Sequence, residues 1–423
     1  MTLTRTISIG AAHLTIEDVD AVARRSASAE VCADTRSRLD RSYAYVRAVA
    51  KTPMQIYGLT TGCGPLASQR IPPERREEFQ RNLIRSHAAT LGPPHPTAFV
   101  RAAMTVRAQV LAQGYSGVDP QVVPQLIAML NHGLHPIVRE VGSVGASGDL
   151  VELAQVALAV IGEGTVEYGG SVVAAAEALR AAGIAPLVPR YREGLALING
   201  TAFHTGAAAV LMMRARRVCA AAQIAAAMSF EALRGNLEAY DPAFQAVRPH
   251  PGQRVAAAHL TRMVSGSRLV GGSETLASAQ DAYTLRCIPQ VIGTVIDALA
   301  AAASVIETEI NSVTDNPLFL VDEERIVHGG NFHGQPVAMA LDHLKIAMVE
   351  LGVMSERRLA RVLDANLNAG LPPFLIRDGA GLRSGFMGLQ YCASSMAADN
   401  AVLAAPASVR SVPTNANNQD VVS

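Results

Sequence analysis

The chain has 423 residues, of which 49% are hydrophobic and 17% are charged, so it can bury a large core. Its 36 basic residues balance its 36 acidic residues, and it contains no Trp. Nucleic acid and anionic membrane are therefore poor candidate partners, because both bind through basic surfaces and bases also need aromatic stacking platforms.

Cysteine usage and the apolar segments indicate the compartment. The five cysteines are far apart, with no C-x-x-C pair, so neither a disulfide framework nor a cysteine zinc site is expected. No secretory apolar region follows the N-terminus. The most apolar helical segment, 291–306, contains Asp297 and is shorter than a membrane span. We expect a cytoplasmic protein.

Long apolar helices dominate the sequence pattern. A short extended piece at 7–9 comes first, and a small hairpin is predicted around 168–170. Helices are predicted over 18–25, 35–50, 77–89, 98–113, 122–131, 150–161, 205–234, 290–310, 335–363 and 385–403. We therefore expect a mainly α fold with a long central helix bundle, divided into an N-terminal domain over 1–200 and a helical domain over 201–423.

Glycine-rich polar loops interrupt these helices. Three glycines and a proline within 57–65 demand an irregular loop. A short apolar run ends in Asn199-Gly200, which is either a turn or an amide presented at the end of a buried segment. A later loop holds His328 and His333, but no third ligand is spaced to complete a metal site, so no metal is expected.

Single polar side chains on the predicted helices are ambiguous. A lone histidine such as His87 is more often structural than catalytic. Tyr283 and Arg286, at i and i+3, share one face of a helix, and the fork of Arg286 suits a carboxylate. A surface arginine is the simpler interpretation of that position.

The segment Ala146-Ser147-Gly148 lies just before the predicted helix 150–161. One interpretation is a tight turn in which Ser147 or Asp149 caps that helix. The other is chemical. The amide nitrogen of Gly148 attacks the carbonyl carbon of Ala146, and loss of water, including the Ser147 hydroxyl, leaves a 4-methylidene-imidazole-5-one (MIO) electrophile. Glycine is needed there because its nitrogen must approach closely and its backbone must bend. The loop alone favours the cap.

Six motifs, in this order, resemble those of the MIO-dependent aromatic amino acid ammonia-lyases and aminomutases. They are Tyr57-Gly58-Leu59-Thr60-Thr61-Gly62, Gly145-Ala146-Ser147-Gly148-Asp149-Leu150, Leu197-Ile198-Asn199-Gly200-Thr201, Gln280-Asp281-Ala282-Tyr283, Gly330-Asn331-Phe332-His333 and Asn418-Gln419-Asp420. The resemblance covers 57–423. It implies a fold of the fumarase/aspartase-like superfamily, with a loop-rich N-terminal domain that bears MIO. It also implies a homotetramer whose active sites combine loops of three subunits.

The resemblance also implies a role for each motif residue. The tyrosine of the first motif would take the β-proton, the arginine would pair with the substrate carboxylate, and the phenylalanine would shield the electrophile. Catalytic roles are implied for Tyr57, Ala146, Ser147, Gly148, Asn199 and Tyr283. Substrate-binding roles are implied for His87, Gln280, Arg286, Asn316, Phe332 and Gln419. A phenol with an ordinary pKa of about 10 would need a lower value to serve as the base.

Two positions bear on the substrate. His87 matches the histidine of tyrosine- and histidine-acting members, and Gln419 stands where histidine ammonia-lyases usually carry a glutamate. This pair favours tyrosine, with elimination to 4-coumarate as the expected reaction. The alternatives are a tyrosine 2,3-aminomutase that gives β-tyrosine and a histidine ammonia-lyase that gives urocanate. Lyase and aminomutase share the catalytic residues, and we favour the lyase.

The sequence departs from the family pattern at three places. Thr90 and Leu91 replace the usual glycine after His-Ala-Ala, and Val151-Glu152 replaces a small residue and a proline after the MIO motif. Family members also continue for many helical residues beyond the position of Ser423. A non-enzymatic helical scaffold is the competing class of protein, but a scaffold has no need for this set of polar motifs.

Overall fold

The structure is a computed structural model, and it describes residues 5–10, 13–271 and 280–423. The chain forms two compact units. The first unit comprises 1–213, 304–338 and 408–423, and the second comprises 214–303 and 339–407. The sequence predicts two domains that meet at residue 200. These two units do not test whether those domains are independent, so that boundary stays a prediction.

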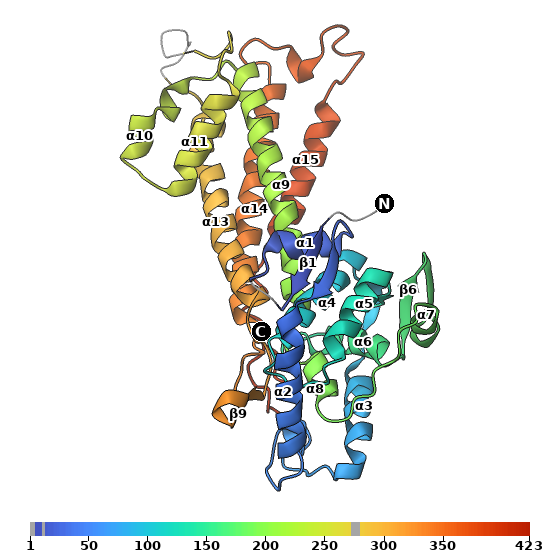
Figure 1. The fold of residues 1–423 in the computed structure, drawn as a ribbon. Helices are drawn as coiled ribbons and strands as arrows, with labels where there is room; N and C mark the ends of the chain where they lie inside the picture. Colours follow the sequence, from blue (N-terminus) through green and yellow to red (C-terminus); the bar gives the residue numbers. More distant parts are fainter. Residues whose placement is uncertain (1–4, 11–12, 272–279) are drawn as a thin grey trace. The chain divides into compact units, whose positions relative to one another are not determined.

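The first unit consists of helices with short strands between them (Figure 1). Its helices are α1 (Ile16–Ala23), α2 (Ala33–Val49), α3 (Arg76–His87), α4 (Thr97–Ala112), α5 (Val122–His132), α6 (Leu150–Val160), α7 (Ala175–Ala181) and α8 (Glu193–Ile198). Its strands are β1 (Thr6–Ile9), β2 (Ser28–Val31), β3 (Leu91–Pro94), β4 (His135–Pro136), β5 (Arg139–Val141), β6 (Thr165–Tyr168), β7 (Ser171–Ala174), β8 (Leu318–Leu320) and β9 (Arg325–Val327). β1 pairs with β2 in parallel, and the pairs β3–β5, β4–β6, β6–β7 and β8–β9 are antiparallel.

The second unit holds α10 (Pro242–Ala246), α11 (Pro251–Met263), α12 (Tyr283–Arg286) and α15 (Met387–Leu403). Three long helices have residues in both units, namely α9 (Ala202–Ala232), α13 (Ile288–Ile310) and α14 (Gln335–Leu363). The mainly α prediction is confirmed, and the predicted helix 335–363 matches α14 in both bounds. The hairpin predicted around 168–170 is confirmed by β6 and β7.

α13 begins at Ile288 because Pro289 lies in its first turn, where a missing N–H costs no helical hydrogen bond. The helix has 23 residues, so the expectation that this segment is too short to span a bilayer is wrong on length. Among the described residues it is the one helix that is long and apolar enough to do so. Core helices of soluble proteins pass the same test, so the finding is weak evidence for a membrane span.

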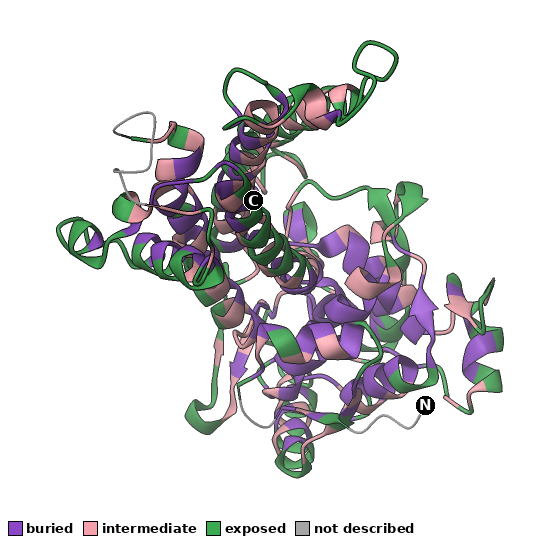
Figure 2. Ribbon diagram, turned by 90° about the horizontal axis from the view of Figure 1, so that it is seen from above, coloured by how far each residue is buried: buried purple, intermediate pink, exposed green. Residues whose placement is uncertain are grey.

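The core of the first unit gathers around α4. Every residue of this helix from Val100 to Ala112 is buried, as expected for a helix covered on all sides. Buried residues are frequent in helices such as α4 (Figure 2), but not in every helix, because α15 contains no buried residue.

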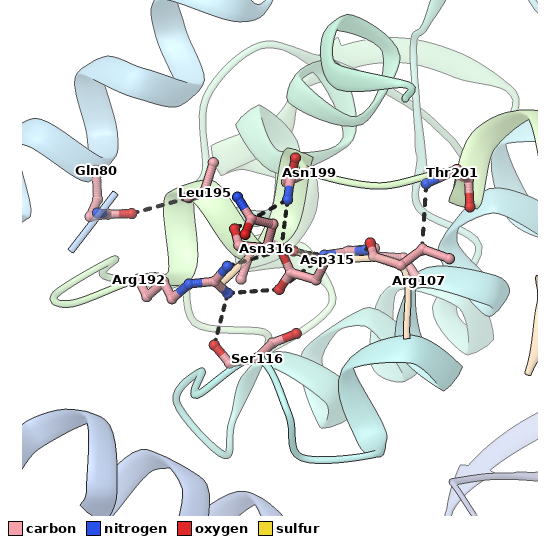
Figure 3. A network of polar contacts seen from close by, with 11 residues as sticks. Gln80, Arg107, Ser116, Arg192, Leu195, Asn199, Thr201, Asp315 and Asn316 are labelled. Carbon is pink, nitrogen blue, oxygen red and sulfur yellow. Dashed lines mark hydrogen bonds and ion pairs between the residues drawn. The ribbon is translucent and has the colours of Figure 1, made fainter. Parts of the chain in front are cut away.

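A buried ion pair fixes the short helix α8 at both ends (Figure 3). Arg192, at the N-cap of α8, donates from Nη1 and Nη2 to the carboxylate of Asp315 at 2.7 and 2.9 Å. Asn199, at the C-cap, donates from Nδ2 to the same carboxylate at 2.9 Å. Burial alone would raise the pKa of Asp315, but Arg192 and Arg107 outweigh burial and hold the pKa below its usual range. Asp315 therefore sets the position of Asn199.

Removing this carboxylate leaves two buried guanidinium groups without their counter-charge. Asp315→Ala should lower the free energy of unfolding by about 3–5 kcal/mol, the cost of breaking a buried ion pair from one side. The matched control is Asp322→Ala, because Asp322 pairs with Arg41 at the surface and its side chain is 84% exposed. That variant should cost at most about 1 kcal/mol. Urea unfolding followed by circular dichroism measures both, and equal losses would contradict this role of Asp315.

Candidate active site

A cavity of about 640 Å³ in the first unit brings together segments that are far apart in the sequence. Four of the predicted site residues line it, namely Tyr57, His87, Ser147 and Gln419. The remaining wall is largely apolar and includes Leu83, Leu150, Leu195 and Ile198. Its size and apolar lining suit a small organic ligand.

Tyr57 stands in the glycine-rich loop at one side of this cavity. Its phenol oxygen accepts a hydrogen bond from the Gly64 N–H at 2.7 Å. Burial raises the pKa of Tyr57 to about 12, the neighbouring Cys63 adds to the rise, and the Gly64 N–H opposes it. To act as a base, Tyr57 would need a pKa below its ordinary value. Within the first unit its pKa is raised instead, because burial is the largest effect.

His87 is the last residue of α3, and its ring is fixed by that helix. Nδ1 lies 2.8 Å from the carbonyl oxygen of Leu83 and 3.1 Å from the hydroxyl of Ser86. A carbonyl only accepts, so Nδ1 carries a proton, and in the neutral tautomer that this contact selects Nε2 presents a lone pair. His87 therefore offers a hydrogen-bond acceptor to a ligand in the cavity.

Gln419 is half-buried and comes from the C-terminal part of the first unit. Its Oε1 accepts from Asn415 Nδ2 at 2.6 Å and from Thr414 Oγ1 at 3.0 Å. Because its oxygen is engaged in this way, the amide presents its N–H₂ group as a donor. Of these two residues, His87 thus offers an acceptor to the cavity and Gln419 offers a donor.

The loop that carries Ser147 forms a tight turn. Gly148 N–H donates to the carbonyl of Gly145 at 3.2 Å, and both Ser147 and Gly148 adopt left-handed backbone conformations, with φ of 52° and 72°. A Cβ on Gly148 would lie 2.4 Å from the carbonyl oxygen of Gly200 and 2.7 Å from that of Phe332. Only glycine fits this close approach of three backbone segments.

Of the two candidates for the cap of α6, Ser147 and Asp149, the position is right for Asp149, but the expected capping hydrogen bond is missing. Asp149 occupies the N-cap position, but no side chain caps α6 there. Instead, Asp149 Oδ2 accepts from the backbone N–H groups of Phe203 and His204 at 2.7 and 2.9 Å. These amides lie in the first turn of α9, where N–H groups lack helical partners. Asp149 therefore ties the Ser147 loop to the start of α9.

Asn199 and Gly200 lie on the other side of this loop. Gly200 N–H donates to the carbonyl of Ser147 at 3.1 Å, and its own carbonyl accepts from Asp149 N–H at 2.8 Å. Asn199 Nδ2 also donates to the carbonyl of Asn316 at 3.3 Å. The Asn316 side chain accepts from Gly329 N–H at 2.8 Å, so Asn316 holds the glycine-rich loop before α14.

Gln280, Tyr283 and Arg286 lie in the second unit. Gln280 and Arg286 line a separate pocket of about 420 Å³ in that unit. Tyr283 is 69% exposed, and the Arg286 guanidinium lies 4.6 Å from the centre of its ring. These three predicted residues are thus not among those that line the cavity of the first unit.

Two features of the site could not be read from single motifs. Asp315 lies in a run that the sequence marks only as a polar break, and Cys63 lines the cavity beside Tyr57. No group of three or more His, Cys, Asp or Glu side chains able to hold a metal is found among the described residues.

Comparison with known proteins gives a consistent result. Residues 14–423 match the sequence model of the aromatic amino acid lyase family. The chain is 46% identical over 421 residues to histidine ammonia-lyase of Gloeobacter violaceus. This match covers the whole chain and 82% of that protein. It is 45% identical to histidine ammonia-lyase of Treponema denticola over 99% of the chain and 82% of that protein.

A solved structure of tyrosine aminomutase from Streptomyces globisporus superposes with a TM-score of 0.95 at 39% identity. That match covers 99% of this chain and 82% of the other. Both the sequence match and the fold match extend over nearly all of the chain. The chain therefore belongs to the aromatic amino acid lyase family, and it is an ammonia-lyase.

Proposed function

We propose that the chain eliminates ammonia from L-histidine, with an MIO electrophile formed from Ala146-Ser147-Gly148. The observation that carries the choice of substrate is the 45–46% identity to histidine ammonia-lyases over almost the full chain. This differs from the tyrosine substrate that His87 and Gln419 favour in the sequence. The geometry of those two residues accommodates both substrates.

Ring closure fits the backbone of the Ser147 loop. The Gly145–Gly148 hydrogen bond and the left-handed conformations of Ser147 and Gly148 already fold the chain back on itself. The Gly148 amide is free of side-chain obstruction, as attack on the Ala146 carbonyl requires. Once formed, MIO supplies an electrophile that takes up the substrate amine and makes it a better leaving group.

Tyr57 is the proposed base for the β-proton. The Gly64 N–H already points at its oxygen and stabilises the phenolate. Burial opposes that ionisation, and a positive charge entering the cavity would favour it. We therefore expect Tyr57 to lose its proton readily only when the substrate and its surrounding cations are in place. Water exclusion then strengthens each of these interactions.

The ring of the substrate would lie between His87 and Gln419. A neutral imidazole has one N–H donor and one acceptor nitrogen, which complement the acceptor of His87 and the donor of Gln419. A phenol hydroxyl can also donate to one group and accept from the other. A plain phenyl ring would leave both groups unpaired, which costs binding.

A second candidate substrate is tyrosine. It is favoured by Gln419, which replaces the glutamate usual in histidine ammonia-lyases, and by the 39% identity to a tyrosine aminomutase. With tyrosine, release of 4-coumarate would indicate a lyase, and formation of β-tyrosine would indicate re-addition of the ammonia.

We also propose a homotetramer in which Gln280, Tyr283 and Arg286 of other copies complete each cavity. Such an assembly would explain why the family motifs of one chain lie partly in its first unit and partly in its second. Arg286 would pair with the substrate carboxylate through its two-pronged geometry. Phe332, half-buried and with its backbone against Gly148, would cover the electrophile. We place this enzyme in the cytoplasm.

Ser147→Ala tests the electrophile. Without the hydroxyl no methylene carbon can form, so turnover of histidine should fall below detection while the helical circular dichroism is retained. Ser86→Ala is the matched control, because Ser86 lines the same cavity but has no part in ring closure. It should keep activity within about tenfold, since its hydroxyl makes only ordinary hydrogen bonds, with the Leu83 carbonyl and with Nδ1 of His87. A Ser147→Ala variant with wild-type turnover would exclude MIO.

His87→Phe tests the substrate ring. Loss of the acceptor should lower kcat/KM for histidine by about 10- to 100-fold, the equivalent of about 1–3 kcal/mol, and raise the relative use of phenylalanine. His132→Phe is the control, because His132 makes the same contact with the carbonyl four residues earlier, at 2.9 Å, and is exposed at the last residue of α5. The measurement is kcat/KM for histidine, tyrosine and phenylalanine with all products separated. If the wild-type protein prefers tyrosine, the histidine proposal is wrong and tyrosine is the substrate.

A further inference from the structure

Three ionisable side chains lie together behind the Ser147 loop. Asp149 and Glu152, at the start of α6, are each 6% exposed. His204, in the first turn of α9, places Nδ1 2.6 Å from Asp149 Oδ1. From the sequence, Glu152 stands out only as a departure from the family pattern, and His204 does not stand out at all.

Glu152 reaches the loop from one side. The Ser143 hydroxyl donates to its carboxylate, and Ser143 Oγ accepts from Gly145 N–H at 3.2 Å. The carbonyl of Gly145 in turn accepts from Gly148 N–H at 3.2 Å. A continuous chain of hydrogen bonds therefore runs from Glu152 to the amide nitrogen that ring closure uses.

Asp149 and His204 hold the other side. Asp149 binds the first turn of α9 through two backbone N–H groups and the imidazole. His204 packs against the backbone before α14, because a Cβ on Gly334 would lie 2.5 Å from its Cε1. His204 Nε2 and Glu152 Oε2 are buried and make no hydrogen bond within the part of the chain that the structure describes. The cluster is thus closely packed, but two of its polar atoms lack hydrogen-bond partners among the described residues.

The charges of this cluster depend on one another. Burial and the charge of Asp149 raise the pKa of Glu152 to about 7, against the opposing effect of Ser143 and His204. Burial would lower the pKa of His204, but the carboxylates of Asp149, Glu309 and Glu152 outweigh it and raise the pKa. Arg107 on α4 is the further cation whose field reaches Asp149.

We propose that Glu152, Asp149 and His204 are positioning residues that hold the loop 143–148 in shape only while their charges balance. The cation of His204 offsets Asp149, and neutral Glu152 still accepts the Ser143 hydroxyl through its carbonyl oxygen. Ionisation of Glu152 puts a second carboxylate beside Asp149, and the repulsion between these like charges destabilises the packed arrangement that holds the loop. The catalytic part of this proposal rests on the MIO function proposed above.

The sign of the pH effect follows from the raised pKa of Glu152. Protonated Glu152 supports the folded state at low pH, and this support is lost as the pH rises towards about 7. Glu152→Gln keeps the hydrogen-bonding shape and cannot ionise. The Tm of wild type relative to Glu152→Gln should therefore fall between about pH 5 and pH 8. Glu177→Gln, an exposed change on α7, should show no such fall.

Two further readouts separate charge balance from simple packing. In a His204→Asn background the fall should move to higher pH, because loss of a neighbouring cation raises a carboxylate pKa further. The kcat of wild type relative to Glu152→Gln should drop by about tenfold across the same pH range, the equivalent of one pKa unit of interaction. Glu152→Asp keeps the titrating group and should keep a pH-dependent fall.

The proposal is overturned by a Tm difference that does not depend on pH, or by a fall that His204→Asn leaves in place. A fall in Tm with no change in kcat would overturn the positioning role. If Glu152→Gln does not fold, the same comparison is made between wild type and Glu152→Asp, whose fall should lie at a different pH. Ring closure at Ala146–Gly148 removes two waters from the chain. A wild-type chain of full calculated mass would overturn the MIO proposal instead, while the Tm series still tests the charge balance.

Discussion

The carboxylate of Asp315 is the group on which the geometry of the candidate site depends. It binds Arg192 before α8 and Asn199 after it, so this short helix is clamped at both ends. Gly200 follows directly, and its backbone pairs with Ser147 and Asp149. A charge buried in this way is costly unless it is fully paired, and here both oxygens are paired. The position of the Ser147 loop thus follows from an ion pair outside the cavity.

The Ser147 loop is held by backbone contacts more than by side chains. Gly148 lies against the carbonyls of Gly200 and Phe332, and Asp149 reaches past its own helix to the start of α9. Such contacts leave little freedom to the segment between them, which is what ring closure needs. Pre-organisation of this kind would lower the entropic cost of an intramolecular ring closure.

The helices and the chemistry of the loops were predictable from sequence, for different reasons. Apolar periodicity fixed helices such as α14 because a buried stripe must recur every three or four residues. The order of six polar motifs indicated the family, which the comparisons confirm. The capping hydrogen bond of α6 was mispredicted because an aspartate before a helix usually binds that helix, and only the tertiary fold brings α9 within its reach. The proton position on His87 and the orientation of Gln419 depend on the neighbours Leu83 and Asn415, which no linear pattern reveals.

The central claim is that Ala146-Ser147-Gly148 is held so that it closes into MIO. Trypsin should release the segment 140–180 as a single peptide, because it is bounded by Arg139 and Arg180 and has no basic residue before Arg180. The most direct test is the mass of this peptide from the purified wild-type protein. The account predicts a mass two waters below that calculated from the sequence, with the loss mapped to Ala146–Gly148 by fragmentation. A peptide of full calculated mass from enzyme that eliminates ammonia would contradict it.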